Sequence, residues 1–144
     1  MAKSAYLEVN SGVSDFKQKY EEIAAARTLT AADSGKVFGV NQASAYEITL
    51  PLAASAGAGW HCKFVLSKVA SNAVTIANNT AEDSIVGMVA GADDGSAGNS
   101  AVSAFDEIVF ISCSSLGDSV ELFCNGINYF AKAIVHDVAH VTIS

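Results

Sequence analysis

The chain has 144 residues, of which 51% are hydrophobic and 16% charged, and its formal net charge is −7. Its few lysines and arginines do not cluster beyond KQK at 17–19, which argues against a nucleic-acid surface. Its apolar runs are too short for a membrane span, and the N-terminus lacks the apolar stretch of a signal peptide, so we expect a soluble protein made in a cytoplasm.

The charged fraction is low for a soluble domain, where about 25% is usual. A chain of this size has room for one hydrophobic core but still needs polar surface. The shortage of charge therefore suggests that part of the surface is covered, either by a partner or by further copies of the chain.

The first 28 residues differ from the rest. In SDFKQKYEEIAAA (14–26), Ser14 suits a helix N-cap, and Phe16, Tyr20 and Ile23 fall on one helical face. This pattern predicts one short helix, whose apolar side must dock on something because so short a helix is marginal alone. We predict an N-terminal arm over residues 1–28 and a body over residues 29–144.

From Leu29 onward the pattern is one of strands and turns. TAADSGK (30–36) predicts a polar turn, whereas AASAGAG (53–59) and GADDGSAGNS (91–100) predict loops. Alternating or continuous apolar residues predict strands in YEITLP (46–51), WHCKFVLS (60–67), NAVTIANN (72–79), SIVGMVA (84–90), DEIVFISCS (106–114) and VAHVTIS (138–144). Short strands spaced roughly 8–12 residues apart indicate an all-β, antiparallel body, either a β-sandwich or jelly-roll-like.

The clearest hairpin lies in LGDSVELFCNGINYFAKAI (116–134), where Asn125-Gly126 suits a two-residue type I′ turn. That turn predicts three facing pairs on one side of the sheet: Cys124 with Ile127, Leu122 with Tyr129, and Val120 with Ala131. Phe123 and Phe130 then lie on the other side, among Glu121, Asn128 and Lys132. Phe123 and Phe130 are our candidate subunit interface, with an interior position as the equal alternative.

Residues that could carry chemistry are few. His136 and His140 have the spacing of a helical zinc motif, but their neighbours favour a strand, on which they would stand roughly 13 Å apart. Asp93, Asp94 and Asn99 lie in a glycine-rich loop without the acid spacing of a calcium loop. We therefore predict no metal, no cofactor, no catalytic residue and no enzymatic activity.

The three cysteines, Cys62, Cys113 and Cys124, are widely spaced and contain no CxxC pair. Each lies in an apolar run, where a free cysteine behaves as a small core residue. The sequence therefore predicts three reduced, buried thiols rather than a disulfide framework or a zinc site.

Three segments together resemble virion proteins of tailed bacteriophages, and most of all their small capsid decoration, or cement, proteins. They are RTLTAADSGKVFGVNQASAYEITLP (27–51), WHCKFVLSK (60–68) and GDSVELFCNGINYF (117–130). The matching residues are ones that form turns or occupy positions in strands. Two positions depart from the family pattern: Ser119 stands where tryptophan is common, and Tyr129-Phe130 replaces Trp-Tyr.

The resemblance implies a homotrimer on the outer surface of an icosahedral head, with an arm that grips the major capsid protein and no contact with nucleic acid or membrane. The arm residues expected to make that contact are Tyr6, Leu7, Phe16, Tyr20 and Ile23. A phage tail-fibre or receptor-binding β module, which shares the β composition, is the alternative function.

Overall fold

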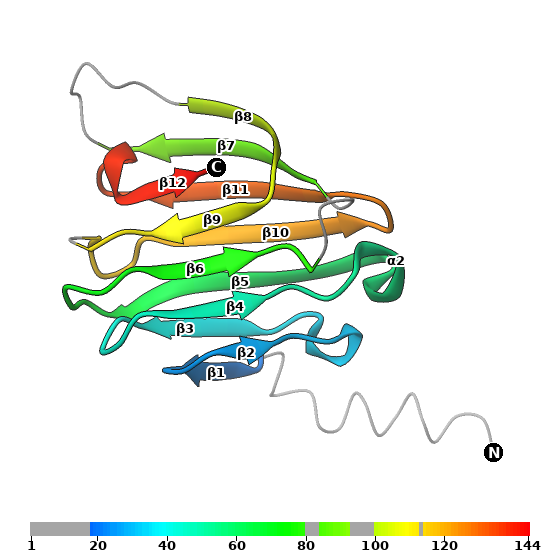
Figure 1. Ribbon diagram of the computed structural model, residues 1–144, viewed down its shortest axis with the longest axis horizontal. Coiled ribbons are helices and arrows are strands. Elements are labelled where there is room, and N and C mark those ends of the chain that lie inside the picture. The colour runs from blue at the N-terminus through cyan, green and yellow to red at the C-terminus, as the bar shows by residue number, and fades with distance from the viewer. Residues whose placement is uncertain (1–17, 80–83, 93–99, 113) are drawn as a thin grey trace, which may run out of the picture.

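The computed structural model of the protein describes residues 18–79, 84–92, 100–112 and 114–144. Within these residues the strands form two sheets, which are drawn one in front of the other in Figure 1. The seven-stranded sheet has the order β1 (Tyr20–Ile23), β3 (Val37–Asn41), β5 (Ala58–Lys68), β10 (Ser119–Asn125), β11 (Tyr129–Val135), β7 (Ile85–Gly91) and β8 (Ser100–Phe105). The five-stranded sheet has the order β12 (Val141–Ile143), β9 (Glu107–Phe110), β6 (Val74–Ala77), β4 (Tyr46–Thr49) and β2 (Arg27–Thr28).

The first six strands alternate between the two sheets, so the chain winds around the core. As a result β1, β3 and β5 pair in parallel in one sheet, and β2, β4 and β6 pair in parallel in the other. Two later strands extend these parallel groups: β9 pairs antiparallel with β6 in one sheet, and β10 pairs antiparallel with β5 in the other. The all-β prediction is confirmed, but the expectation of antiparallel strands throughout is wrong, because both sheets are mixed.

Side chains from both sheets form one hydrophobic cluster. Alternation along the strands supplies it: β5 buries Trp60, Cys62, Phe64 and Leu66, while the residues between them are at least partly exposed. Tyr129 is fully buried, packs edge-on against Trp60 and donates its hydroxyl to the carbonyl of Pro51 at 2.6 Å. The aromatic residues of β5 and β11 thus join the hairpin to the chain around Pro51.

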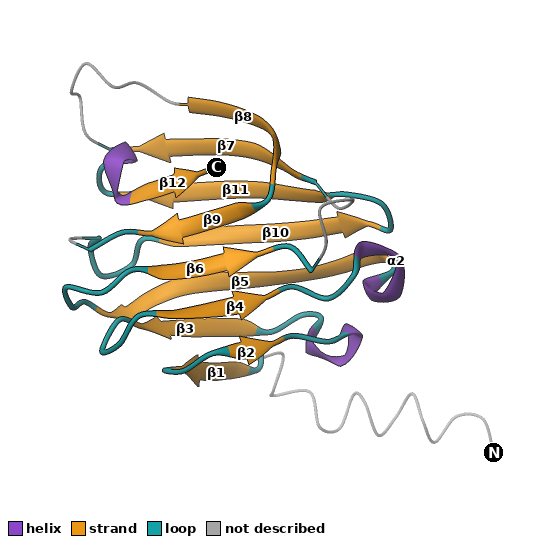
Figure 2. Ribbon diagram, viewed as in Figure 1, coloured by secondary structure: helices purple, strands orange, loops and turns teal. Residues whose placement is uncertain are grey.

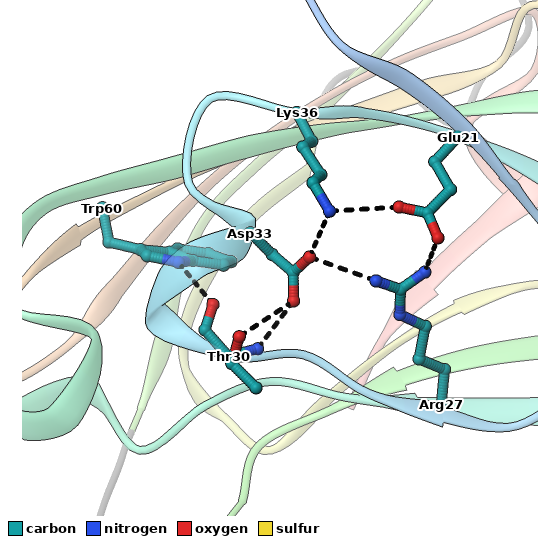
Figure 3. A network of polar contacts seen from close by, with 6 residues as sticks. All are labelled: Glu21, Arg27, Thr30, Asp33, Lys36 and Trp60. Atoms are coloured by element: carbon teal, nitrogen blue, oxygen red, sulfur yellow. Dashed lines mark hydrogen bonds and ion pairs between the residues drawn. The ribbon is translucent and has the colours of Figure 1, made fainter.

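A network of charges fixes the turn between β2 and β3 (Figure 3). The buried carboxylate of Asp33, in the 3-10 turn η2 (Ala31–Asp33), accepts from the backbone N–H of Thr30 at 2.9 Å and from Lys36 at 2.7 Å. Arg27 donates both to Asp33 and to Glu21. The TAADSGK segment is therefore a polar turn, as predicted, and it connects β1, β2 and β3.

The helix predicted over residues 14–26 is wrong where the structure describes it, because Tyr20–Ile23 is strand β1. β1 pairs in parallel with β3, and its Ile23 is buried in the core. Pairing satisfies the backbone of these residues and buries Ile23, which a marginal helix could not do alone. Residues 1–17, which make up most of the predicted arm, lie outside the described residues, and the division at residue 28 stays a prediction.

The hairpin is present, but its loop is longer than predicted. Cys124 faces Tyr129 and Leu122 faces Ala131, and β10 ends at Asn125, so Gly126, Ile127 and Asn128 lie between the two strands instead of the predicted two-residue turn at 125–126. Asn125 Oδ1 accepts from the backbone N–H groups of Ile127 and Asn128, and Gly126 adopts a φ of 90°. The register moves by two residues, so the division into a buried and an exposed side is preserved, except that Ile127 is exposed.

Three other local predictions differ from the structure. Residues Ala53–Ala56 of the predicted loop 53–59 form the short helix α2, and β8 begins where the predicted loop 91–100 ends. The predicted last strand begins with the 3-10 turn η3 (Val138–His140), and only Val141–Ile143 pairs as β12. Figure 2 shows how small the helical part is. No helix in the described parts of the chain is long and apolar enough to cross a membrane.

Candidate functional site

The candidate site is the outer face of the seven-stranded sheet, the side opposite the core. Buried and exposed residues alternate along β11 and along β10 from Val120 onward, which places Glu121 and Phe123 of β10 and Phe130, Lys132 and Ile134 of β11 on this face. β5 contributes its partly or fully exposed residues His61, Lys63 and Val65, and β7 contributes Met88.

The outer face carries several large apolar side chains that are exposed to solvent. Phe123 is 49% exposed, Phe130 42%, Met88 50% and Ile134 52%. The Phe123 and Phe130 side chains are a cross-strand pair, with ring centroids 6.5 Å apart. Contiguous apolar groups on a rigid sheet are typical of a surface that another protein covers.

Strand register orders these residues in rows across the sheet. One row runs His61, Phe123, Phe130 and Val86, and the next runs Lys63, Glu121, Lys132 and Met88. In the second row Lys63 and Glu121 form an ion pair with 3.3 Å between Nζ and Oε1. The face therefore combines an aromatic row with a row of alternating charge, and both rows are held in place by four paired strands.

A groove of about 510 Å³ follows these two rows. Among the described residues, the groove is lined by Lys36, Lys63 and Lys132, by one carboxylate, Glu121, and by the rings of Phe123 and Phe130. Three of the eight lysines and arginines of an acidic chain thus gather at one groove. Lys36 is paired with Asp33 and Glu21, and Lys63 is paired with Glu121, so it is the aromatic rings and Lys132 that suit a partner presenting apolar and acidic groups.

The predicted arm residues fall in different places. Tyr20 is 59% exposed, and its ring crosses β3 at Gly39, where a side chain would collide with the tyrosine hydroxyl. Ile23 is buried in the core, so as an arm contact it is wrong: it cannot touch another protein while β1 stays paired. Tyr6, Leu7 and Phe16 lie outside the described residues.

The prediction of buried cysteines is confirmed for Cys62 and Cys124, while Cys113 lies outside the described residues. Burial, with a smaller contribution from the charge of Asp33, raises the pKa of the Cys62 thiol far above its ordinary value. Such a thiol is not a nucleophile at neutral pH. His61, its neighbour in the chain, points to the opposite side of the sheet.

The predicted placement of His136 and His140 on one strand is wrong. β11 ends at Val135 and η3 turns the chain back, which brings the two imidazole rings to a centroid distance of 6.2 Å. The expected separation assumed an extended chain between them. Asp93, Asp94 and Asn99, the other residues weighed for cation binding, lie outside the described residues.

Sequence reasoning placed Phe123, Phe130, Glu121 and Lys132 on one side of the sheet, as the structure shows, but missed Ile134 and Met88. Ile134 follows Lys132 at the next alternate position of β11, so the same alternation could have found it. Met88 could not have been found in this way, because β7 pairs with β11 in parallel from a distant part of the sequence.

The chain matches no known protein family, no curated protein and no solved structure.

Proposed function

We propose that the protein is a structural virion protein that decorates a phage capsid and stabilises it as a homotrimer clamping adjacent major capsid protein subunits. Two observations support this function: the resemblance over residues 27–130, and an exposed apolar face on a rigid two-sheet body that we interpret as a β-sandwich. The proposal includes no enzymatic activity and no cofactor.

The outer face is the observation on which the proposal chiefly rests. Phe123, Phe130 and Ile134 are held by backbone pairing on both sides of β10 and β11, so little conformational entropy is lost when a partner covers them. We assign Phe123 and Phe130 to the contact between subunits of the trimer. A trimer presents the same capsid-binding segment three times, so contacts that are weak singly give a high overall avidity for the capsid.

The N-terminal residues are assigned to the capsid. The sequence ahead of β1 contains three large apolar residues, Tyr6, Leu7 and Phe16. The exposed ring of Tyr20, in β1, adds a fourth on the body itself. β1 and β2 of the predicted arm are paired in the two sheets, so we assign the contact with a neighbour to the residues ahead of β1.

A tail-fibre or receptor-binding module is the second candidate, and the groove favours it. Two exposed phenylalanine rings beside three lysines form a site that could also hold an acidic or sugar-like group of a host surface. In that case the groove would bind a small ligand in a protein that does not attach to heads.

The test is co-sedimentation with undecorated heads of the phage that encodes the chain. We expect the full chain to pellet with heads, and a chain beginning at Gln18, which keeps β1 and β2, to stay in the supernatant while remaining folded by circular dichroism. A full chain that does not pellet with heads would contradict the decoration function and favour the receptor-binding module.

A further inference from the structure

Three side chains from separate segments converge beside the end of β11. Asp118 immediately precedes β10, His136 immediately follows β11, and His140 is the last residue of η3. This cluster is independent of the outer face and of the proposed virion function.

The carboxylate of Asp118 is buried, with its side chain 2% exposed. Its Oδ1 accepts from the backbone N–H of His136 at 2.7 Å, and its Oδ2 accepts from the backbone N–H of Ser115 at 2.7 Å. Oδ2 also lies 2.9 Å from Nδ1 of His140. The carboxylate therefore fixes the loop before β10, the end of β11 and the His140 ring together.

The contact between Asp118 and His140 selects one form of the imidazole. An ionised carboxylate can only accept hydrogen bonds, so Nδ1 of His140 carries the proton and donates it. In the neutral imidazole the other ring nitrogen, Nε2, then keeps its lone pair, whereas in the imidazolium it carries a second proton that a metal ion must displace. The neutral form has the arrangement of metal-binding histidines, whose second nitrogen commonly donates to a carboxylate that orients the ring.

His136 supplies a second imidazole next to the first. The two rings lie nearly parallel, with an interplanar angle of 24° and centroids 6.2 Å apart. Two imidazoles bound to one tetrahedral ion through nitrogens at about 2.0–2.1 Å have ring centres roughly 5 Å apart, so the two rings must approach by roughly 1 Å to share an ion. His136 is exposed, so its ring can turn about χ2 without disturbing the core.

We propose that His136 and His140 bind one divalent transition-metal ion, with Asp118 as the residue that positions His140. Imidazole nitrogen selects Zn²⁺, Ni²⁺ or Cu²⁺ over Mg²⁺ and Ca²⁺, which prefer oxygen. The described residues contain no group of three or more histidines, cysteines and carboxylates that could hold a metal ion. The protein thus supplies two ligands, water completes the shell, and binding is weaker than at a four-ligand structural zinc site.

Metal binding at this position has a structural consequence. His140 leads directly into β12, which forms the edge of the five-stranded sheet by pairing with β9. An ion shared with His136 would tie this edge to the end of β11 in the other sheet. Because the arrangement of the two rings exists only in the folded chain, the ion raises the unfolding temperature, and the rise grows with the logarithm of the ion concentration above the dissociation constant.

The experiment is isothermal titration of the untagged full chain with ZnCl₂ and with NiCl₂, with MgCl₂ as the control ion. We expect one equivalent of Zn²⁺ or Ni²⁺, a rise in unfolding temperature that EDTA reverses, and no heat with Mg²⁺. His136→Gln removes an exposed ligand without touching Asp118 and should weaken binding at least tenfold; His140→Gln should do the same.

The matched control is His61→Gln, because His61 is exposed on the outer face, far along the chain from the cluster. It should leave the affinity unchanged. No binding to the wild-type chain at millimolar Zn²⁺ or Ni²⁺ would overturn the proposal. So would an affinity that survives His136→Gln in a variant shown to be folded, or one that is lost with His61→Gln.

Discussion

Asp33 joins three parts of the chain through one carboxylate. It accepts from Thr30 in its own turn, from Lys36 at the start of β3 and from Arg27 in β2. Burial raises the pKa of Asp33, but the hydrogen bonds from Lys36 and Thr30 and the charges of Lys36 and Arg27 outweigh it, so this pKa lies below its usual value. The ionised form is therefore the one that stabilises the fold.

Asp33→Asn should lower the free energy of unfolding at pH 7 by about 2–4 kcal/mol, because two cations lose their buried partner. A lowered carboxyl pKa contributes stability that is present above the unfolded pKa, about 3.9, and is lost as the pH falls through the folded pKa. The difference between wild type and variant should thus be constant above about pH 5 and shrink below pH 4.

Denaturant titrations from pH 2.5 to 7 measure this difference. The control is Glu47→Gln, since Glu47 is an exposed carboxylate whose side chain accepts from the hydroxyl of nearby Thr49. It should change stability by less than about 0.5 kcal/mol. A wild-type advantage over Asp33→Asn that persists undiminished at pH 2.5 would show that the ionised carboxylate is not the cause.

At the scale of elements, the 116–134 hairpin depends on Asn125. Its side-chain oxygen accepts from two backbone N–H groups of the loop, those of Ile127 and Asn128. Asn125→Ala should lower the free energy of unfolding by about 1–2 kcal/mol, because both donors lose this partner. Asn79→Ala, at an exposed loop position, is the control and should have little effect. The measurement is denaturant unfolding, and equal denaturation midpoints for Asn125→Ala and Asn79→Ala would contradict the role of Asn125.

The elements differ in how well the sequence predicts them. β5, β10 and β11 bury every second residue over six residues or more, and this period of two indicates both a strand and the side that it buries. β1 has only four residues, and the spacing of Tyr20 and Ile23 fits a helix equally well. The pairing of β1 with β3 makes this segment a strand rather than a helix, and no local sequence pattern encodes that contact.

At the scale of the whole molecule, strand counting predicted an all-β body but not its winding. Parallel pairs such as β3 with β5 require the chain to cross through the other sheet between them, and alternation along a strand is the same for parallel and antiparallel neighbours. The same limit applied to the candidate sites. Met88 and the approach of His136 to His140 depend on contacts and a turn that local periodicity does not report.

The proposed trimer requires the outer face to be covered by further copies of the chain. Multi-angle light scattering on the purified full chain tests this most directly. We predict a mass three times that of the 14.8 kDa chain, and a monomer for the double variant Phe123→Ser with Phe130→Ser. Ile127→Ser, which removes an exposed apolar side chain from the hairpin loop, should remain a trimer. A monomeric wild type, or a trimer that the double variant leaves intact, would contradict the proposed assembly.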